Sequence, residues 1–262
     1  MKAIPFFILA CHLSLAGAQE AKAPFVTTPD EVVARMLRLA NTGAGDYVID
    51  LGSGDGRIVI AAARDFGARG LGVDLDAKLV ALSRERARRA GVEERARFEE
   101  RDVLLTDVSQ ASVVTIYLLP WLIDRLQPKL LAELRPGTRV VTHAFNMIGW
   151  KPDRTETVRL EKRHEMQGGE STIYLWLVPA QARGAWRGAG WQLRIAQNFQ
   201  EIEVEAEQAG IARRVEAARL EGKAILFSGS GFRFQGEVEA GRMAGTMETA
   251  GRAQPVEFLR QP

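Results

Sequence analysis

Apolar and polar positions alternate with two different periods along the chain, and the change of period divides it in two. Between residues 47 and 178, short apolar runs of strand length are separated by stretches whose apolar residues recur every three to four positions, as in helices that cover a sheet. From Trp191 onward the period becomes two, with glycine turns between short segments, which predicts an antiparallel meander of about seven strands. Residues 179–190, rich in Ala, Gly and Pro, separate the two regions. We therefore expect an α/β domain over residues 25–179 and a β-meander or barrel-like accessory domain over residues 184–262.

Residues 1–18 have the form of a secretory signal peptide. Lys2 precedes an apolar run that ends in the small-residue pattern Ala16-Gly17-Ala18, which is typical of a cleavage site. We therefore predict export to a periplasmic or extracellular location, with no transmembrane span in the mature chain. Retention as a membrane anchor, for which the run is short, and lipid attachment at Cys11 are alternatives. Export would separate the chain from any cofactor made in the cytosol, so a cytoplasmic location is a further alternative.

The overall charge gives no sign of a nucleic-acid partner. The chain has 35 basic and 33 acidic residues among 262, so it has no large positive excess for a phosphate backbone. Its three histidines, His12, His143 and His164, are too scattered along the sequence to predict a metal site. We expect neither nucleic acid nor a metal ion at the functional site.

One stretch, residues 47–76, predicts a nucleotide-binding turn. An apolar strand runs into a glycine-rich loop, and a helical pattern begins at Arg57. Glycines let a ligand approach the backbone amides at the start of the helix. A second strand ends in Asp74, where an acid would accept hydrogen bonds from a ribose diol. The predicted cofactor-binding residues of this stretch are Asp50, Gly52, Ser53, Gly54, Asp55, Gly56, Asp74 and its neighbour Leu75.

Charge favours S-adenosylmethionine over a dinucleotide as the ligand. Asp50 and Asp55 would repel a pyrophosphate at the helix N-terminus, and the third glycine, Gly56, comes one residue early for dinucleotide spacing. S-adenosylmethionine carries no phosphate, and carboxylates attract its ammonium and sulfonium groups. We therefore predict S-adenosylmethionine as the cofactor; a bare structural turn between strand and helix is the alternative.

These motifs resemble a known enzyme family. Residues 50–60, Asp-Leu-Gly-Ser-Gly-Asp-Gly-Arg-Ile-Val-Ile, with Gly72-Val-Asp74 after them, look like the first two motifs of class I S-adenosylmethionine-dependent methyltransferases. More narrowly, Val26-Thr-Thr-Pro-Asp-Glu-Val-Val, Tyr117-Leu-Leu-Pro, His143-Ala-Phe-Asn-Met and Trp150-Lys-Pro resemble bacterial relatives of the eukaryotic mitochondrial protein-lysine methyltransferases. The resemblance covers about residues 25–179. It implies a Rossmann-like seven-stranded sheet, a methyl-transfer reaction and a protein lysine as a candidate acceptor.

The resemblance also implies roles for residues outside the glycine loop. The segment with Thr28 would line the methionine end of the cofactor, and Asp102, with its neighbour Val103, would lie at the adenine amino group. The residues alone allow plainer interpretations. Asp102 could cap a loop, while Thr28, with Pro29 and Glu31, has the pattern of a capping box before an amphipathic helix.

Three residues are candidates for catalytic roles at the substrate end. Tyr117 is the polar side chain at the tip of a buried strand, where it would face the methyl group because ligands lie outside the carboxyl ends of parallel strands. We count it as both catalytic and cofactor-binding. His143 and Asn146 follow the next strand and are predicted to contact substrate, with Trp150 as a lid. Core packing of Tyr117 and a structural role for His143 are the alternatives.

The sequence as a whole predicts transfer of a methyl group from S-adenosylmethionine to an acceptor nucleophile. Tyr-Leu-Leu-Pro at residues 117–120 departs from the Asp/Asn-Pro-Pro-aromatic motif of enzymes that methylate base amines or glutamine amides, which argues against those acceptors. A lysine acceptor, suggested by resemblance, has an ordinary pKa near 10.4 and must first lose its proton. The alternatives are a small-molecule methyltransferase and a non-catalytic cofactor-binding or scaffold protein that acts through the β domain.

Overall fold

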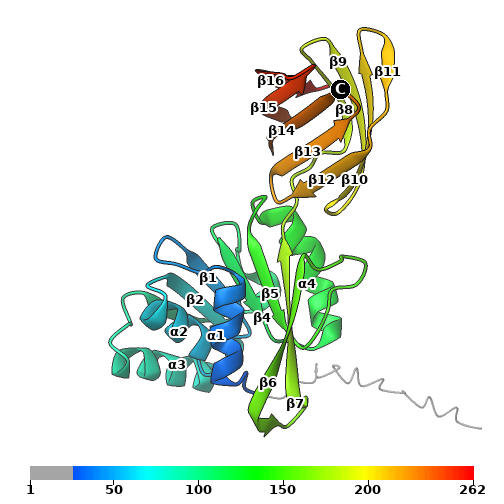
Figure 1. The fold of residues 1–262 in the computed structure, drawn as a ribbon. Coiled ribbons are helices and arrows are strands. Elements are labelled where there is room, and N and C mark those ends of the chain that lie inside the picture. Colours follow the sequence, from blue (N-terminus) through cyan, green and yellow to red (C-terminus); the bar gives the residue numbers. More distant parts are fainter. Residues whose placement is uncertain (1–25) are drawn as a thin grey trace, which may run out of the picture.

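The computed structural model describes residues 26–262 and contains two β-sheets that follow one another along the chain. Figure 1 shows them stacked end to end, with the second sheet beyond one end of the first and the β6–β7 hairpin pointing away from it. The predicted signal peptide lies outside the described residues. Within residues 26–262, every helix is too short or too polar to cross a membrane.

The first sheet has seven strands, of which the first five are parallel. They are β1 (Tyr47–Leu51), β2 (Arg69–Asp74), β3 (Ala96–Glu100), β4 (Val113–Ile116), β5 (Arg139–His143), β6 (Arg154–His164) and β7 (Gly168–Leu177). Their order in the sheet is β3-β2-β1-β4-β5-β7-β6, with β7 antiparallel to both of its neighbours. This order confirms the predicted Rossmann-like sheet. It reverses between β1 and β4, which is where such sheets bind ligands.

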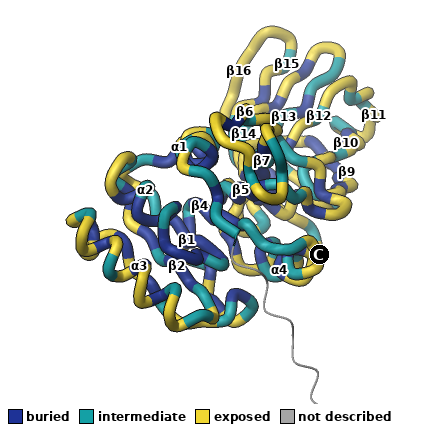
Figure 2. The backbone as a smooth tube through the Cα atoms, turned by 90° about the horizontal axis from the view of Figure 1, so that it is seen from below, coloured by how far each residue is buried: buried dark blue, intermediate teal, exposed yellow. Residues whose placement is uncertain are grey.

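Helices cover both faces of this sheet. They are α1 (Asp30–Leu39), α2 (Arg57–Asp65), α3 (Ala77–Arg89) and α4 (Pro120–Glu133), with a 3-10 turn η1 (Val103–Leu105) after β3. Successive strand residues point to opposite faces, so β1 packs Val48 against α1 and α2 and Ile49 against α4. Figure 2 shows the central strands as buried and the outer faces of the helices as exposed. A parallel sheet requires this cover because both of its faces are apolar.

The capping box predicted at the start of α1 is wrong. The helix begins at Asp30, with Pro29 at the cap position and no capping side chain. The Thr28 hydroxyl instead hydrogen-bonds with Nδ1 of His143, 3.1 Å away on β5. Glu31 accepts a hydrogen bond from the backbone N–H of Glu161 in β6. Thr28 and the His143 imidazole are both buried, and a buried polar group that lacks a hydrogen-bond partner is destabilising. The Thr28 hydroxyl therefore pairs with His143 instead of capping a backbone N–H of α1.

The second sheet has nine antiparallel strands. They are β8 (Gly184–Gly188), β9 (Trp191–Asn198), β10 (Glu201–Gln208), β11 (Ile211–Arg213), β12 (Ala217–Glu221), β13 (Ala224–Gly229), β14 (Phe232–Glu239), β15 (Arg242–Thr249) and β16 (Arg252–Arg260). The order is β11-β10-β9-β8-β16-β15-β14-β13-β12, a half-barrel around a core that includes Trp191 and Phe234. The antiparallel prediction is confirmed, but the number of strands is larger than expected. β8 lies in the Ala/Gly/Pro-rich stretch, and β11 is a three-residue strand without a buried side chain, so neither shows a clear alternation.

Candidate active site

A cavity of about 520 Å³ lies at the carboxyl ends of β1, β2 and β4, at the point where the strand order reverses. Residues that follow β2 and β3 form one side of it. Residues that follow β4 and β5, together with the tip of the β6–β7 hairpin, form the other. Ten of the predicted site residues line it: Thr28, Asp50, Gly52, Ser53, Gly54, Asp55, Asp74, Leu75, Val103 and Tyr117.

The glycine loop is tied to the neighbouring strand β2. The backbone N–H groups of Gly52 and Ser53 both donate to the carbonyl of Val73, at 2.9 Å. Gly52 has φ of 82°, and a Cβ added there would come within 2.5 Å of the Leu118 side chain, which also lines the cavity. The backbone conformation of Gly52 therefore favours glycine, and its lack of a side chain lets Leu118 pack against the β1 loop.

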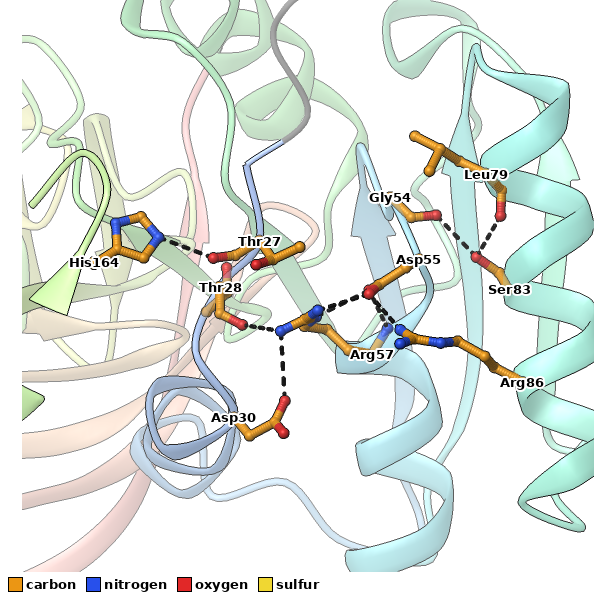
Figure 3. Close-up of polar contacts among 10 residues, drawn as sticks. All are labelled: Thr27, Thr28, Asp30, Gly54, Asp55, Arg57, Leu79, Ser83, Arg86 and His164. Atoms are coloured by element: carbon orange, nitrogen blue, oxygen red, sulfur yellow. Dashed lines mark hydrogen bonds and ion pairs between the residues drawn. The ribbon is translucent and has the colours of Figure 1, made fainter. Parts of the chain in front are cut away.

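Gly56, the third glycine of the motif, does not line the cavity. It stands at the cap position of α2 with φ of 80°, and a Cβ there would meet the side chains of Phe98 and Ser83 at 2.8 Å. Ser83 in turn donates from Oγ to the carbonyl of Gly54, at 2.9 Å (Figure 3). Gly56 thus allows the loop to pack closely on β3 and α3, which fixes the position of the cavity wall.

Asp74 is placed to accept hydrogen bonds from a bound ligand. Its Oδ2 accepts from the backbone N–H of Gly54 and its Oδ1 from that of Asp76, both at 2.9 Å. These bonds fix the orientation of the carboxylate at the cavity wall. A carboxylate oxygen has more than one acceptor position, so each oxygen can still accept a ribose hydroxyl.

Asp55 is buried and pairs with two arginines. Arg57 donates to its Oδ1 from Nε at 2.9 Å and to its Oδ2 from Nη2 at 2.7 Å, and Arg86 also donates to Oδ2. Burial alone would raise the pKa of Asp55, but the two guanidinium groups hold it below its usual value. The charge of this carboxylate is therefore balanced within the protein, which leaves Asp50 and Asp74 to attract a cationic ligand.

The residues ahead of α1, 26–29, which we call the N-terminal segment, form part of the cavity wall and are held by distant side chains. Arg57 donates from Nη1 to the carbonyl of Thr28 at 2.8 Å. His164, at the end of β6, hydrogen-bonds through Nε2 with the carbonyl of Thr27 at 2.9 Å. Figure 3 shows both contacts, with the Arg57 guanidinium between the N-terminal segment and Asp55. Arg57 therefore links this segment to the glycine loop.

Asp50 is almost fully buried at the cavity, and its charge is sensitive to its surroundings. It is 2% exposed, and burial raises its pKa to about 7. A hydrogen bond of 2.7 Å from Thr115 opposes this rise, while the negative charges of Asp74 and Asp55 add to it. A positive group bound nearby would lower this pKa and favour the carboxylate.

The hydroxyl of Ser53 supplies a test of whether the cavity fits S-adenosylmethionine. Its Oγ is buried and has no hydrogen-bond partner among the described residues, although Ser53 lines the cavity. A buried hydroxyl needs a partner, and the methionine part of S-adenosylmethionine carries an ammonium and a carboxylate. With Asp50 and Asp74 nearby, the polar groups of this wall fit the cofactor.

Tyr117 and His143 lie against each other at the other side of the cavity. Their ring centroids are 4.1 Å apart, but only Tyr117 lines the cavity. His143 is fully buried, with Nδ1 at Thr28 Oγ1 and Nε2 at Ser171 Oγ, both at 3.1 Å. Burial, with a smaller effect of His164, lowers the pKa of His143 to about 4, so the imidazole is neutral at pH 7. Burial also raises the pKa of Tyr117.

Three other predicted residues do not line the cavity. Asn146 is exposed, and its Oδ1 accepts from the backbone N–H of Met147 at 2.8 Å. Asp102 accepts from the backbone N–H of Leu104 at 2.8 Å and caps η1, which is the plainer of its two predicted roles. Trp150, predicted as a lid, is 1% exposed and packed in the core, so that prediction is wrong.

Twelve residues line the cavity without having been predicted: Val26, Thr27, Arg57, Ile58, Asp76, Leu79, Leu118, Leu119, Trp121, Leu122, Phe145 and Met166. Several lie inside motifs that the sequence had singled out, such as Leu118 and Leu119 next to Tyr117. Phe145 lies between the two candidates His143 and Asn146. Met166 has no local signal, because only the pairing of β6 with β7 brings the hairpin tip to the cavity.

Comparison with known proteins shows which family the chain belongs to. Residues 50–154 match the family model described as the ANTKMT methyltransferase domain. A "Protein-lysine N-methyltransferase" of Saccharolobus islandicus (strain REY15A) is 39% identical over 156 residues, which make up 59% of this chain and 93% of that protein. The "Adenine nucleotide translocase lysine N-methyltransferase" of Mus musculus is 35% identical over 129 residues, 49% of this chain and 56% of that protein. The chain thus spans just over half the length of the mouse relative.

One solved structure is similar to this chain in both sequence and fold. The crystal structure of an RNA methyltransferase from Salinibacter ruber in complex with S-adenosyl-L-homocysteine is 47% identical, with a TM-score of 0.54. The match covers 60% of this chain and 95% of that chain. S-adenosyl-L-homocysteine is the demethylated product of S-adenosylmethionine, so a protein this similar holds the expected cofactor product.

Proposed function

Because the chain belongs to the family of class I S-adenosylmethionine-dependent protein-lysine methyltransferases, we propose that it transfers the methyl group to the side-chain amine of a lysine in another protein. The chain is an S-adenosylmethionine-dependent methyltransferase; the lysine acceptor is the part that we propose. The supporting observation is the cavity, which has polar, acidic groups at one side and apolar and aromatic groups at the other. The archaeal relative, which is named as a lysine methyltransferase, is covered over 93% of its length.

We propose that the acidic side holds the cofactor. Asp74 would accept the ribose hydroxyls, and Leu75 and Val103 would lie on the two faces of the adenine, with Asp102 near its amino group. Asp50, Ser53 and the N-terminal segment with Thr28 would surround the methionine part. Leu75 is 60% exposed and lines the cavity, so a base bound there would cover its apolar side chain.

The apolar side would receive the lysine. Leu118, Phe145 and Met166 line it, and desolvation by such groups lowers the pKa of an amine. When bound, the cofactor supplies a methyl group on a positively charged sulfur, which makes that sulfur a ready leaving group. The acceptor nitrogen would need a free lone pair directed at that methyl group. The chain itself therefore has to align the neutral amine and exclude water.

Among the candidate catalytic residues, Tyr117 would contact the reacting groups directly. A tyrosine hydroxyl is protonated at neutral pH, and burial raises the pKa of Tyr117 above its ordinary value near 10. Tyr117 would therefore accept a hydrogen bond from the amine through its oxygen rather than act as an anionic base. His143 has both ring nitrogens engaged and would act as a positioning residue behind Tyr117. Asn146, exposed beyond the cavity, would contact the acceptor protein.

Transfer of labelled methyl groups tests this proposal. The purified full chain would be incubated with S-adenosylmethionine carrying a radioactive methyl group and an extract of the source organism, and the extract would then be digested with protease or with ribonuclease. We expect label on protein that only protease releases as small fragments. Label that only ribonuclease releases would favour RNA, the acceptor named for the Salinibacter ruber protein, and label on neither would indicate a small molecule. No transfer by the folded chain would support the scaffold alternative.

A further inference from the structure

One turn of the second sheet differs from all its other tight turns. Seven pairs of strands in this sheet are joined by two-residue turns. Six of these turns contain a glycine: Ala189-Gly190, Ala209-Gly210, Gly222-Lys223, Ser230-Gly231, Ala240-Gly241 and Ala250-Gly251. The seventh, between β9 and β10, is Phe199-Gln200. Where Phe199 stands, four of the other turns have alanine, with φ between 46° and 50°. A large aromatic side chain thus occupies a turn position that elsewhere holds a small one.

The backbone of Phe199 has the same left-handed conformation as the alanines at this position of the other turns, and this conformation is less favourable for a bulky residue. Its φ is 52°, in the left-handed region that bulky residues disfavour and glycine adopts freely. Strain of this kind persists only where other contacts stabilise it. The reason for a phenylalanine at residue 199 therefore has to lie in what its ring contacts.

The ring of Phe199 packs into the core of the first domain. It joins the apolar cluster that is built around β1, β4 and α4, and not the core of its own sheet. There it stacks on Trp150, with ring centroids 5.6 Å apart and ring planes inclined by 8°. Trp150 is 1% exposed, and its carbonyl accepts a hydrogen bond from Nε1 of Trp176 in β7 at 3.0 Å. Phe199 thus closes the core on one side of Trp150.

Gln200 adds a polar contact to the same place. Its Nε2 donates to the carbonyl of Lys151 at 2.5 Å. Two buried atoms at this junction, Trp150 Nε1 and Gln200 Oε1, have no hydrogen-bond partner among the described residues. The contact therefore consists of the aromatic stacking, this side-chain hydrogen bond and an exposed ion pair between Lys151 Nζ and Glu201 Oε1 at 4.0 Å, of which only the stacking is buried at Trp150.

The segment that the turn holds also forms part of the cavity. Residues 144–153, which we call the return segment, run from the end of β5 to the start of β6 without helix or strand. Its ends are fixed by backbone bonds of 2.8 Å from Ala144 to Thr172 and from Asp153 to Leu175. Phe145, near its first end, lines the cavity and packs against the same apolar cluster as Phe199. Between the two ends, the buried side chains of Met147 and Trp150 anchor the segment. Thr142 also donates from Oγ1 to the carbonyl of Phe145, and Gln127 donates from Nε2 to the carbonyl of Ile148 at 3.1 Å.

We propose that Phe199 is a positioning residue for methyl transfer: it fixes the return segment through Trp150 and so keeps Phe145 in place at the acceptor side of the cavity. The second domain then acts on the active site through one hairpin turn. The proposal rests on the proposed function for the identity of the acceptor, but the position of the return segment can be measured without any acceptor.

The variant Phe199→Gly separates this role from a general effect on stability. Glycine relieves the backbone strain at residue 199, so the second sheet should fold at least as well, while the contact with Trp150 is lost. Phe199→Tyr keeps the ring and is the conservative control. Phe232→Leu reduces an aromatic side chain that packs on Trp191 inside the second sheet, and it controls for weakened packing away from the junction.

Hydrogen exchange of the full-length variants decides the question. We expect backbone amides of residues 145–150 to exchange at least ten-fold faster in Phe199→Gly than in the wild type, Phe199→Tyr or Phe232→Leu. Calorimetric affinity for S-adenosylhomocysteine should stay within two-fold, because the glycine loop is untouched. With a protein acceptor, the KM for that acceptor should rise several-fold while the KM for the cofactor is unchanged, and Phe199→Tyr should restore the wild-type value.

Unchanged exchange in Phe199→Gly, or equally fast exchange in Phe232→Leu, would overturn the proposal. Faster exchange with unaltered acceptor kinetics would overturn the positioning role as well. Failure of the proposed function has a different signature, since it would leave these exchange rates as expected while the wild type labels no protein lysine.

Discussion

The three carboxylates around the glycine loop differ in what surrounds them, and this sets their roles. Asp55 is paired with Arg57 and Arg86, so these two guanidinium groups balance its negative charge. Asp50 is buried, with Thr115 as its one side-chain hydrogen-bond donor among residues 26–262, and its pKa is raised to about 7. Asp74 receives two backbone N–H groups and faces the cavity. Asp74 is therefore the carboxylate best placed for a direct charged hydrogen bond to the cofactor.

Replacing Asp74 tests this assignment. In Asp74→Ala, we expect the affinity for S-adenosylhomocysteine to fall by about ten- to a hundred-fold, because a hydrogen bond to a charged group contributes ~1.5–3 kcal/mol and ~1.4 kcal/mol corresponds to a factor of ten. Calorimetric titration measures the change. Asp107→Ala removes an exposed carboxylate away from the cavity and should bind as the wild type does. Equal affinity of both variants for S-adenosylhomocysteine would show that Asp74 does not contribute to cofactor binding.

Asp50 and His143 give the cofactor-free protein opposite responses to pH. Between about pH 4 and 7, Asp50 holds a proton in the folded state that it has lost in the unfolded state, so its contribution to stability falls as pH rises. His143, whose pKa falls from 6.5 to about 4 on folding, takes up a proton in this window only in the unfolded state. Its contribution is complete above pH 6.5 and is lost as pH falls toward 4. The two contributions nearly cancel in the wild type.

Single variants of this pair should reveal the cancellation. Asp50→Asn removes the opposing response, so between pH 6.5 and 4 its free energy of unfolding should fall by on the order of 3 kcal/mol more than that of the wild type, since one pKa unit corresponds to ~1.4 kcal/mol. His143→Gln should show the opposite difference and gain stability relative to the wild type as pH falls from 7 to 4. Urea unfolding at a series of pH values measures both. Parallel curves for the wild type and the two variants would show that neither group has a shifted pKa of this kind.

At the scale of elements, the N-terminal segment depends on side chains from three different parts of the chain. Thr27 and Thr28 are held by Arg57 from α2, His143 from β5 and His164 from β6. The segment itself has no regular structure. Its place at the cavity wall is therefore set by these contacts.

Arg57 and Arg64 offer a matched pair of variants on the same helix. In Arg57→Ala, loss of the bonds to Asp55 and to the Thr28 carbonyl should free the N-terminal segment, and we expect about ten-fold weaker binding of S-adenosylhomocysteine and faster hydrogen exchange over residues 26–30. Arg64→Ala removes an exposed arginine that pairs with Asp65 and should change neither quantity. Slow hydrogen exchange of the N-terminal segment in Arg57→Ala would contradict this role for Arg57. It would show that the contacts with His143 and His164 are enough to hold the segment in place.

The local parts of the site could be predicted from sequence, and the distant parts could not. The strand, glycine loop and acid of residues 47–74 form one continuous unit, so their pattern predicts both the fold and the ligand site. Thr28 has a strong local capping pattern, and only the folded sheet reveals that His143 competes for its hydroxyl. The place of Met166 at the cavity depends on the pairing of β6 with β7, and the packing of Trp150 depends on Phe199 of the second domain. The sequence around either residue has no periodicity that predicts these contacts.

At the scale of the whole molecule, the two domains are linked by several contacts besides the chain itself. The backbone N–H of Ala180 donates to the carbonyl of Gly222 at 2.8 Å, and a Cβ at Gly222 would come within 2.9 Å of Gly137. Together with Phe199, these contacts bring two hairpin turns of the second sheet against the first domain. The accessory domain is thus attached at the end of the first sheet opposite the β6–β7 hairpin (Figure 1), whose tip contributes Met166 to the cavity wall.

Export of the chain remains a proposal that rests on the form of residues 1–18. We expect the mature protein, purified from the source organism, to begin near Gln19, because the small-residue pattern at residues 16–18 is typical of a cleavage site. N-terminal sequencing with fractionation of cytosolic, membrane and exported protein measures this. An intact Met1 in the cytosolic fraction would instead place the enzyme beside its cofactor supply.

The most direct test of lysine methylation is identification of the atom that receives the methyl group. Protein labelled by the wild-type enzyme would be hydrolysed to amino acids and the labelled product compared with methylated standards, with Asp74→Ala as the control of reduced cofactor binding. We predict Nε-methylated lysine as the labelled product, at a strongly reduced level with the variant. Label on another amino acid, or equal lysine labelling by both proteins, would contradict lysine methylation by the cavity at the ends of β1, β2 and β4.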